Sequence, residues 1–225
     1  MVLLTALAVV FSCGCTKSDD PNNGDGTYNG HAYVDLGLPS GTLWATCNVG
    51  ADMPEGFGDY FACGETTPKT TYEWSNYRYC NGNKNQLTKY CSNANYGYNG
   101  FTDNLTALQS IDDAATANWG SGWCMPTKDQ LSELLNYTAI TEYMQNGVKG
   151  LLFTASNGKS LFLPAAGGKF TSGDGGGVHC CYWSCSVKNS EAWMLYYGSD
   201  MLNSYNTWRN PRYAGQSVRP VRSTH

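Results

Sequence analysis

The C-terminal part of the chain decides the fold, through three short apolar and aromatic runs: CYWS at residues 181–184, AWMLYY at 192–197 and QSVRPVR at 216–222. Each run has the length and the aromatic or β-branched content that is typical of a strand. We therefore predict strands at residues 182–185, 192–197 and 217–222. The residues expected to face inward at strand period and to form core are Trp183, Trp193, Leu195, Val218 and Val221.

The segments between these strands have a composition suited to recognition. Between Cys180 and Arg222 the chain has five Tyr, three Trp, four Asn and four Arg, but only two acids, Glu191 and Asp200. Rigid aromatic rings supply contact area at low entropic cost, and Asn, Ser and Arg supply adaptable hydrogen bonds. We predict a ligand-binding face in the loops at 187–191 and 199–214. Its candidate residues are Lys188, Asn189, Asp200, Asn203, Tyr205, Asn206, Trp208, Arg209, Asn210, Arg212 and Tyr213.

The composition limits the classes of protein that the chain can represent. Its 225 residues suffice for one domain of ordinary size, and 26 Gly and 16 Tyr with only 14% charged residues favour a loop-rich β or α+β domain over a helical bundle. The net charge of −4, without a basic cluster, argues against nucleic acid as a partner. Ten cysteines indicate an oxidising compartment.

The N-terminal segment predicts export and a lipid anchor. Residues 1–12 are apolar and are typical of a secretory signal, and Cys13 follows Val10, Phe11 and Ser12 in a pattern that resembles a bacterial lipobox. The resemblance implies cleavage before Cys13 and attachment to the outer membrane or cell surface through acyl chains alone. Cys15 is the alternative lipidated residue, and an ordinary signal peptide is the alternative to a lipoprotein. The polar stretch 13–29 reads as a flexible tether before a domain at 30–225.

Local signals predict most of the remaining elements. Alternation at 31–36 and the apolar run at 42–47 indicate two strands, and Asn157-Gly158 between the apolar runs 151–155 and 159–163 indicates a hairpin. Residues 112–119 begin with two acids and continue with helix formers. Thr127 and Gln130 form a capping box that predicts a helix to about residue 136.

The segment 69–106 shows no hydrophobic period, and two of its cysteines are candidates for a disulfide. Cys80 and Cys91 lie eleven residues apart in a stretch of Tyr, Asn, Gly and Lys that lacks an apolar core of its own. In an oxidising compartment a bridge between them would close a short loop. The alternative is a pair of reduced, buried thiols.

Several motifs together resemble a family of lipoproteins. They are YVDLGLPSGTLWA at 33–45, GDYFA at 58–62, GETTP at 64–68, Trp123 with MPT at 125–127, FLPAAG at 162–167, YWS at 182–184 and SVRPV at 217–221. They span residues 30–222 and resemble the Bacteroidetes surface lipoproteins of the Fibrobacter major paralogous domain family. That family is similar to the C-type lectin-like fold of formylglycine-generating enzymes and of diversity-generating retroelement variable proteins.

The resemblance implies an α+β domain with two helices, a small antiparallel sheet and long loops, in which the C-terminal strands and loops bind a protein or glycan ligand. In the variable proteins, the diversified positions cluster in the same region. The Glu-Pro-Asn and Trp-Asn-Asp signatures of calcium-dependent sugar binders are absent, so neither calcium nor a monosaccharide ligand follows from the fold. No cofactor is expected.

Two alternatives to a binding protein follow from the same residues. Formylglycine-generating enzymes bind copper through two cysteines five positions apart, and Cys180 and Cys185 have that spacing, with His179 and Cys181 beside them. Strand residues five apart point to opposite faces, however, which argues against a shared metal and against a copper- or thiol-dependent oxidase. The third interpretation is a subunit of a pilus-like surface assembly.

Overall fold

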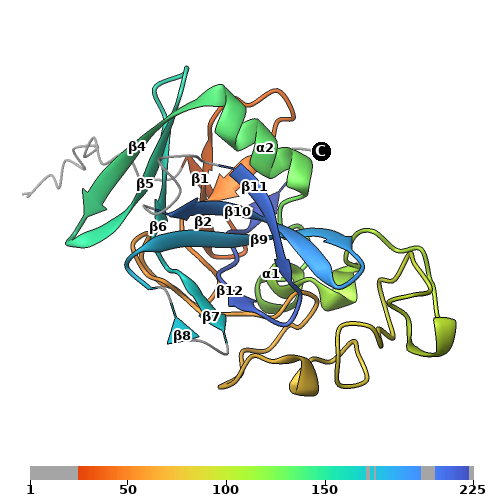
Figure 1. The fold of residues 1–225 in the computed structure, drawn as a ribbon. Coiled ribbons are helices and arrows are strands. Elements are labelled where there is room, and N and C mark those ends of the chain that lie inside the picture. The colour runs from red at the N-terminus through yellow and green to blue at the C-terminus, as the bar shows by residue number, and fades with distance from the viewer. Residues whose placement is uncertain (1–24, 171–172, 175, 199–205, 223–225) are drawn as a thin grey trace, which may run out of the picture.

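The computed structural model describes residues 25–170, 173–174, 176–198 and 206–222. Within these residues, antiparallel strands form four small sheets and two α-helices accompany them (Figure 1), so the predicted α+β class is confirmed. In the described ranges, no helix has the length and hydropathy needed to cross a membrane. The predicted signal segment 1–12 and the predicted lipidation residue Cys13 lie outside the described residues.

One sheet joins the two ends of the described chain, in the order β1-β2-β3-β13. Its strands are β1 (Gly26–Tyr28), β2 (His31–Asp35), β3 (Leu43–Ala45) and β13 (Val221–Arg222). β2 and β3 confirm two predicted strands, whereas β1 corrects the expected tether, because the folded part begins four residues before Gly30. Asn29 and Gly30 both have positive φ and form the tight turn that pairs β1 with β2, so this Asn-Gly is a hairpin signal of the same kind as Asn157-Gly158.

The sheet at the centre of the molecule has the order β11-β10-β9. Its strands are β9 (His179–Lys188), β10 (Glu191–Gly198) and β11 (Asn206–Pro211). β9 and β10 confirm the predicted strands at 182–185 and 192–197 and extend both. β11 corrects the expected loop at 199–214, because residues 206–211 pair with residues 191–196 along the whole strand.

The hairpin of β9 and β10 separates two apolar cores. Trp183 and Met194 belong to the core that packs against α1 and the segment before it, whereas Tyr182 and Leu195 belong to the core under α2. The predicted burial of Trp183, Leu195, Val218 and Val221 is confirmed. Successive residues of β9 and β10 point to opposite faces of the hairpin, and most residues on both faces are buried. Neither face is therefore exposed to solvent along most of its length.

Trp193 is the exception among the predicted core residues, because it is only half-buried. The pairing of β10 with β9 shifts register between Ala192 and Met194, and Trp193 lies at that irregularity. The Lys128 ammonium and the Arg209 guanidinium lie 4.4 and 5.3 Å from its ring centroid. Trp193, which was expected to lie in the core, therefore contacts two cations at the surface with its ring.

The remaining two sheets flank the central one. They consist of β4 (Thr138–Gln145), β5 (Val148–Ala155) and β6 (Ser160–Pro164), and of β7 (Gly168–Phe170), β8 (Gly173–Asp174) and β12 (Gly215–Gln216). The hairpin of β5 and β6 is confirmed at the predicted Asn157-Gly158 turn. The predicted strand 217–222 is wrong for most of its length, since only β13 is a strand there and Pro220, which lacks an N–H, precedes it.

Both predicted helices form, and side chains cap them as the sequence indicates. Helix α1 (Ala114–Trp119) begins after Asp113, whose carboxylate accepts a 2.9 Å hydrogen bond from the Thr116 N–H. Helix α2 (Lys128–Tyr137) begins at the predicted capping box, in which the Gln130 N–H donates to Thr127 Oγ1 at 3.1 Å and the Thr127 N–H donates to Gln130 Oε1 at 2.8 Å.

A long segment, residues 69–111, lies beside the central sheet and is called the insert below (Figure 1). Its described helices are only short 3₁₀ turns, at Trp74–Asn76, Tyr98–Gly100 and the start of Ser110–Asp112. Asp112, 2% exposed, anchors it by accepting hydrogen bonds from the Tyr79 hydroxyl, from the Tyr90 hydroxyl at 2.5 Å and from the Lys89 ammonium at 2.5 Å.

The Asp112 anchor predicts a specific acid sensitivity. Burial alone would raise the pKa of the Asp112 carboxyl, but the bonds from Lys89, Tyr79 and Tyr90 outweigh burial and lower this pKa below its ordinary value. A lowered pKa contributes stability that is present above the unfolded-state value and is lost as pH falls through the folded-state value, so the loss should begin below about pH 4.

We expect Asp112→Asn to lower the free energy of unfolding by about 2 kcal/mol at pH 7, because it removes a buried charged acceptor. The difference from the unmodified protein should shrink between about pH 4 and pH 2, which urea unfolding at each pH measures. Asp52→Asn removes an exposed carboxylate and is the matched control. An undiminished difference at low pH would contradict the role of Asp112.

Candidate ligand-binding pocket

The turn between β9 and β10 is the element around which the pocket forms. Lys188 pairs with Glu191, so only Asn189 and Ser190 lie between the strands. Asn189 has φ of 53°, in the left-handed region that Asn tolerates better than most residues, and this suits a two-residue hairpin turn. The sequence therefore places Lys188, Asn189, Ser190 and Glu191 side by side at the tip of a buried hairpin.

The insert is attached to this turn by the guanidinium of Arg212, which is completely buried. Its Nη1 donates hydrogen bonds to the carbonyl oxygens of Lys89, Tyr90 and Asn189, at 3.1, 3.2 and 2.9 Å, and its Nε donates to the Tyr77 hydroxyl at 2.8 Å. One side chain from the end of β11 thus binds both the insert and the hairpin turn. Burial raises the pKa of the Tyr77 hydroxyl well above its usual value, so this hydroxyl stays neutral.

A second link between the turn and the insert comes from the Asn189 side chain. Its Oδ1 accepts hydrogen bonds from the Ser92 N–H and the Ser92 hydroxyl, both at 3.1 Å. Asn189 therefore holds the turn against the insert through its side chain and through its main-chain carbonyl. Its role is mainly structural, although it borders the pocket.

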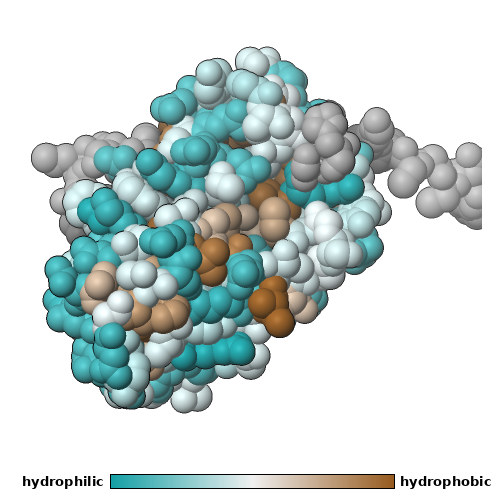
Figure 2. Space-filling model, turned by 90° about the vertical axis from the view of Figure 1, so that its right-hand side faces the viewer, coloured by the Kyte–Doolittle hydropathy of each residue, from teal (hydrophilic) through white to brown (hydrophobic). Residues whose placement is uncertain are grey.

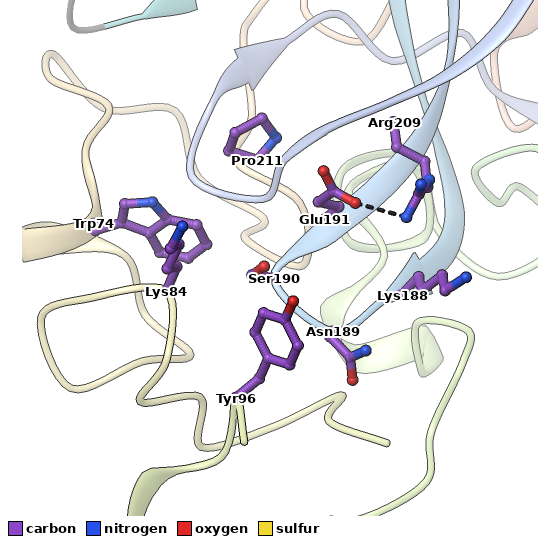
Figure 3. Close-up of a pocket in the computed structure, with 9 residues that line it drawn as sticks. All are labelled: Trp74, Lys84, Tyr96, Lys188, Asn189, Ser190, Glu191, Arg209 and Pro211. Atoms are coloured by element: carbon purple, nitrogen blue, oxygen red, sulfur yellow. Dashed lines mark hydrogen bonds and ion pairs between the residues drawn. The ribbon is translucent and has the colours of Figure 1, made fainter. Parts of the chain in front are cut away.

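The turn, β11 and the insert enclose a cavity of about 280 Å³, called the hairpin pocket (Figure 3). Its lining residues are Trp74, Lys84, Tyr96, Lys188, Asn189, Ser190, Glu191, Arg209 and Pro211. Figure 3 shows the insert residues on one side and the pair of Glu191 and Arg209 on the other. The pocket thus brings together residues more than 90 positions apart in the sequence.

Local packing positions the aromatic residues of the insert. Trp74 is half-buried, with Tyr213 at 5.1 Å and Tyr77 at 5.6 Å between ring centroids, both in edge-on geometry. Tyr96 is fixed by its main-chain carbonyl, which accepts a 2.8 Å hydrogen bond from the fully buried Leu87. The Trp74 ring and the Tyr96 main chain are therefore held in place, and part of each side chain remains accessible.

Positive charge predominates around the pocket. Arg209 forms a 2.7 Å ion pair with Glu191, and both side chains are about 40% exposed. Lys84 and Lys188 are exposed, and neither ammonium has an acidic or hydrogen-bonding partner within the described part of the chain. A protein of net charge −4 thus has a pocket with three cations and one carboxylate, which can attract an anion.

The structure brings three of the predicted ligand residues, Lys188, Asn189 and Arg209, into the hairpin pocket. Tyr213 lies behind Trp74 and supports its ring. Asn206 and Trp208 border a separate depression of about 270 Å³ beside Trp193, and Trp208 and Asn210 border a third, more apolar depression of about 310 Å³. The predicted residues Asp200, Asn203 and Tyr205 lie outside the described residues.

Arg212 is a wrong prediction as a ligand residue. It is 0% exposed, and its Nη1 and Nε already donate to the protein's own groups, so a ligand cannot reach it. Trp74, Lys84 and Tyr96 were missed because the insert has no hydrophobic period. The same mixture of Tyr, Asn, Gly and Lys that indicated recognition in the C-terminal loops also occurs in the insert, and it could have identified this wall of the pocket.

The predicted disulfide between Cys80 and Cys91 is absent, and both thiols are free. The thiols point to different acceptors, since Cys80 Sγ lies 3.1 Å from the Trp74 carbonyl oxygen and Cys91 Sγ lies 3.2 Å from the Asn93 carbonyl oxygen. Leu87, which bridges to both Cys80 and Gly97, occupies the centre of this loop instead. The buried Leu87 and these local hydrogen bonds therefore stabilise the segment for which a disulfide was predicted.

The cysteines that suggested a copper site are divided between the two cores. Cys180 packs in the core under α2, and Cys185 packs in the core on the other face of the hairpin. Burial raises the pKa of the Cys185 thiol to about 12 and that of the Cys180 thiol still further, so both thiols are protonated at neutral pH. Among the described residues, no three His, Cys, Asp or Glu side chains are grouped to hold a metal ion.

Comparison with known proteins gives no match: no family model, no curated protein and no solved structure is significantly similar to this chain.

The Arg212 link predicts a large effect of a conservative substitution. Arg212→Lys keeps the charge but replaces a planar, forked donor by a point charge that cannot reach the same carbonyl oxygens. We expect a loss of about 3 kcal/mol in the free energy of unfolding, measured by urea denaturation, with faster amide hydrogen exchange in the insert at residues 87–92.

Arg209→Lys is the matched control, because the Arg209 ion pair is solvent-exposed and should contribute about 0.5 kcal/mol or less. Equal stabilities of the two variants, with unchanged exchange in the insert, would show that Arg212 does not hold the insert to the turn.

Proposed function

We propose that this chain is a ligand-binding lipoprotein of the bacterial cell envelope, anchored by lipid at Cys13 and binding a protein or glycan through the hairpin pocket. The observation that carries the proposal is the convergence of Trp74, Tyr96, Lys188 and Arg209 on one cavity, with two more polar residues from the turn. Concave sites with aromatic walls and a few polar groups are where proteins bind small ligands and ligand side groups.

The C-type lectin-like fold is part of the same proposal. It is supported by the motifs between residues 33 and 221, by the two helices among antiparallel strands and by the long insert beside the C-terminal strands. In this interpretation the central sheet is a rigid support, and the insert and the hairpin turn present the ligand-binding residues. Sites carried by loops on a rigid scaffold are a common arrangement for binding.

The surface around the insert supports a polar ligand over a large apolar partner. Figure 2 shows a mainly hydrophilic face on which hydrophobic side chains gather in small, separate patches. The exposed large hydrophobic residues of the insert are Tyr98, Phe101 and Ile111. Proteins with obligate hydrophobic partners usually expose a larger continuous apolar patch.

Binding through the hairpin pocket predicts which aromatic residues matter. We expect Trp74→Ala and Tyr96→Ala each to weaken binding to a glycan- or protein-array hit at least tenfold, since each removes about 1.5 kcal/mol or more of ring contact. Trp208→Ala is the matched control, because Trp208 is 53% exposed and lies outside this pocket.

Affinity is measured by titration of the purified protein, and thermal melting checks that each variant folds. If Trp208→Ala abolishes binding while the two insert variants bind normally, the ligand occupies a different depression beside β11.

Lipid attachment at Cys13 makes a separate prediction. In cells fed with labelled palmitate, Cys13→Ser should abolish labelling of the full-length protein, because the acyl chains are attached through that thiol. Cys15→Ser is the control and should retain the label. If only Cys15→Ser loses the label, the lipid is attached to Cys15. If neither the unmodified protein nor the variants are labelled, the protein is not a lipoprotein.

A further inference from the structure

The hairpin pocket holds positive charge that the protein itself does not neutralise. Glu191 is already engaged by Arg209, whereas Lys84 and Lys188 have no acidic partner among the residues that the structure describes. Lys84 reaches the pocket from a tight loop closed by the bond from the Asn81 N–H to the Gln86 carbonyl oxygen, at 2.7 Å. The two ammonium groups thus come from separate elements and lie on opposite sides of the pocket (Figure 3), so a ligand with several anionic groups can place one near each.

The same pocket has aromatic rings suited to a ring-shaped ligand. Trp74 and Tyr96 border the cavity from the insert side, and the rings present electron-rich faces to which weakly positive C–H groups are attracted (Figure 3). A pyranose ring has such a C–H face, whereas the side chain of Asp or Glu has little surface to stack. The combination of stacking faces with free ammonium groups favours an acidic sugar over an acidic peptide.

The size of the cavity agrees with this class of ligand. At about 280 Å³ it lies just below the range of about 300–1,000 Å³ that accommodates drug-sized molecules. A short stretch of a glycan can insert one residue there and leave the rest of the chain outside. Ser190 and Asn189 also border the cavity.

We propose that the hairpin pocket binds an acidic glycan, with Trp74 and Tyr96 stacking on its sugar rings and Lys84 and Lys188 each binding a carboxylate or sulfate group along the glycan. The inference rests on the proposed function, because it assigns a ligand class to the same pocket. Carboxylate and sulfate share the recognition chemistry of an anion on a sugar ring. The test therefore includes both.

The experiment titrates the full chain with oligogalacturonate, with a chondroitin sulfate oligosaccharide and with methyl-esterified oligogalacturonate, followed by calorimetry. We expect at least one charged oligosaccharide to bind, and its affinity to fall as salt is raised. The methyl ester keeps the sugar backbone and removes the charge, so it should bind at least tenfold more weakly than the free acid if the carboxylate is the recognised group. Lys84→Gln and Lys188→Gln should each weaken the charged ligand about tenfold.

Lys149→Gln is the control variant, since Lys149 is a surface lysine of β5 paired with Glu142 and is not part of the pocket. Oligoglutamate tests the alternative class, and binding of this peptide with no binding of either charged oligosaccharide would overturn the sugar assignment. Equal affinity of the unmodified protein and the Lys84 and Lys188 variants would overturn the role of the ammonium groups. A last outcome separates this inference from the proposed function. If the unmodified protein binds an array ligand that Trp74→Ala loses, but binds no charged oligosaccharide, this inference is overturned and the proposed function stands.

Discussion

Burial of the β9–β10 hairpin on both faces is the constraint on which the rest of the structure depends. Tyr182 and Leu195 fill one core and Trp183 and Met194 fill the other, so the hairpin cannot move without disturbing both. Each of these side chains contributes about 1.5–3 kcal/mol by leaving water, so packing on both faces holds the hairpin firmly. The hairpin is therefore a rigid support, and the position of its two-residue turn is fixed by packing rather than by the turn itself.

The binding wall opposite this hairpin is held in a different way. The insert has little regular structure, and buried polar groups attach it: the Arg212 guanidinium on one side and the Asp112 carboxylate on the other. Such groups are costly to leave unpaired, so each polar link is strong only while all its partners are present. The hairpin pocket thus forms between a wall held by apolar packing and a wall in which buried polar groups add to the packing of tyrosines such as Tyr77 and Tyr90.

The sequence predicted those elements whose signals are local. The capping box of Thr127 and Gln130 and the Asn157-Gly158 turn act over three or four residues, and both formed as expected. β11 was missed because its own residues show no strand pattern, and the strand forms only by pairing with β10. Arg212 was misplaced because a charged side chain is expected at the surface, and its burial depends on carbonyl oxygens that are 23 to 123 residues away. For the same reason, the sequence predicted residues on the hairpin side of the pocket and missed those of the insert. The insert meets the hairpin only in the folded chain.

This division of the pocket has a thermodynamic consequence. Parts of a protein open locally with free energies that range from nearly zero to the full stability of the fold, and a segment with few buried apolar side chains opens first. In the insert, Leu87 and a few tyrosines supply the apolar burial, while its attachment to the turn rests on Arg212 and Asn189. A ligand that contacts both walls would bind only the closed form and would therefore stabilise the insert more than the central sheet. Ligand binding and local order of the insert are thus coupled by the geometry of the pocket.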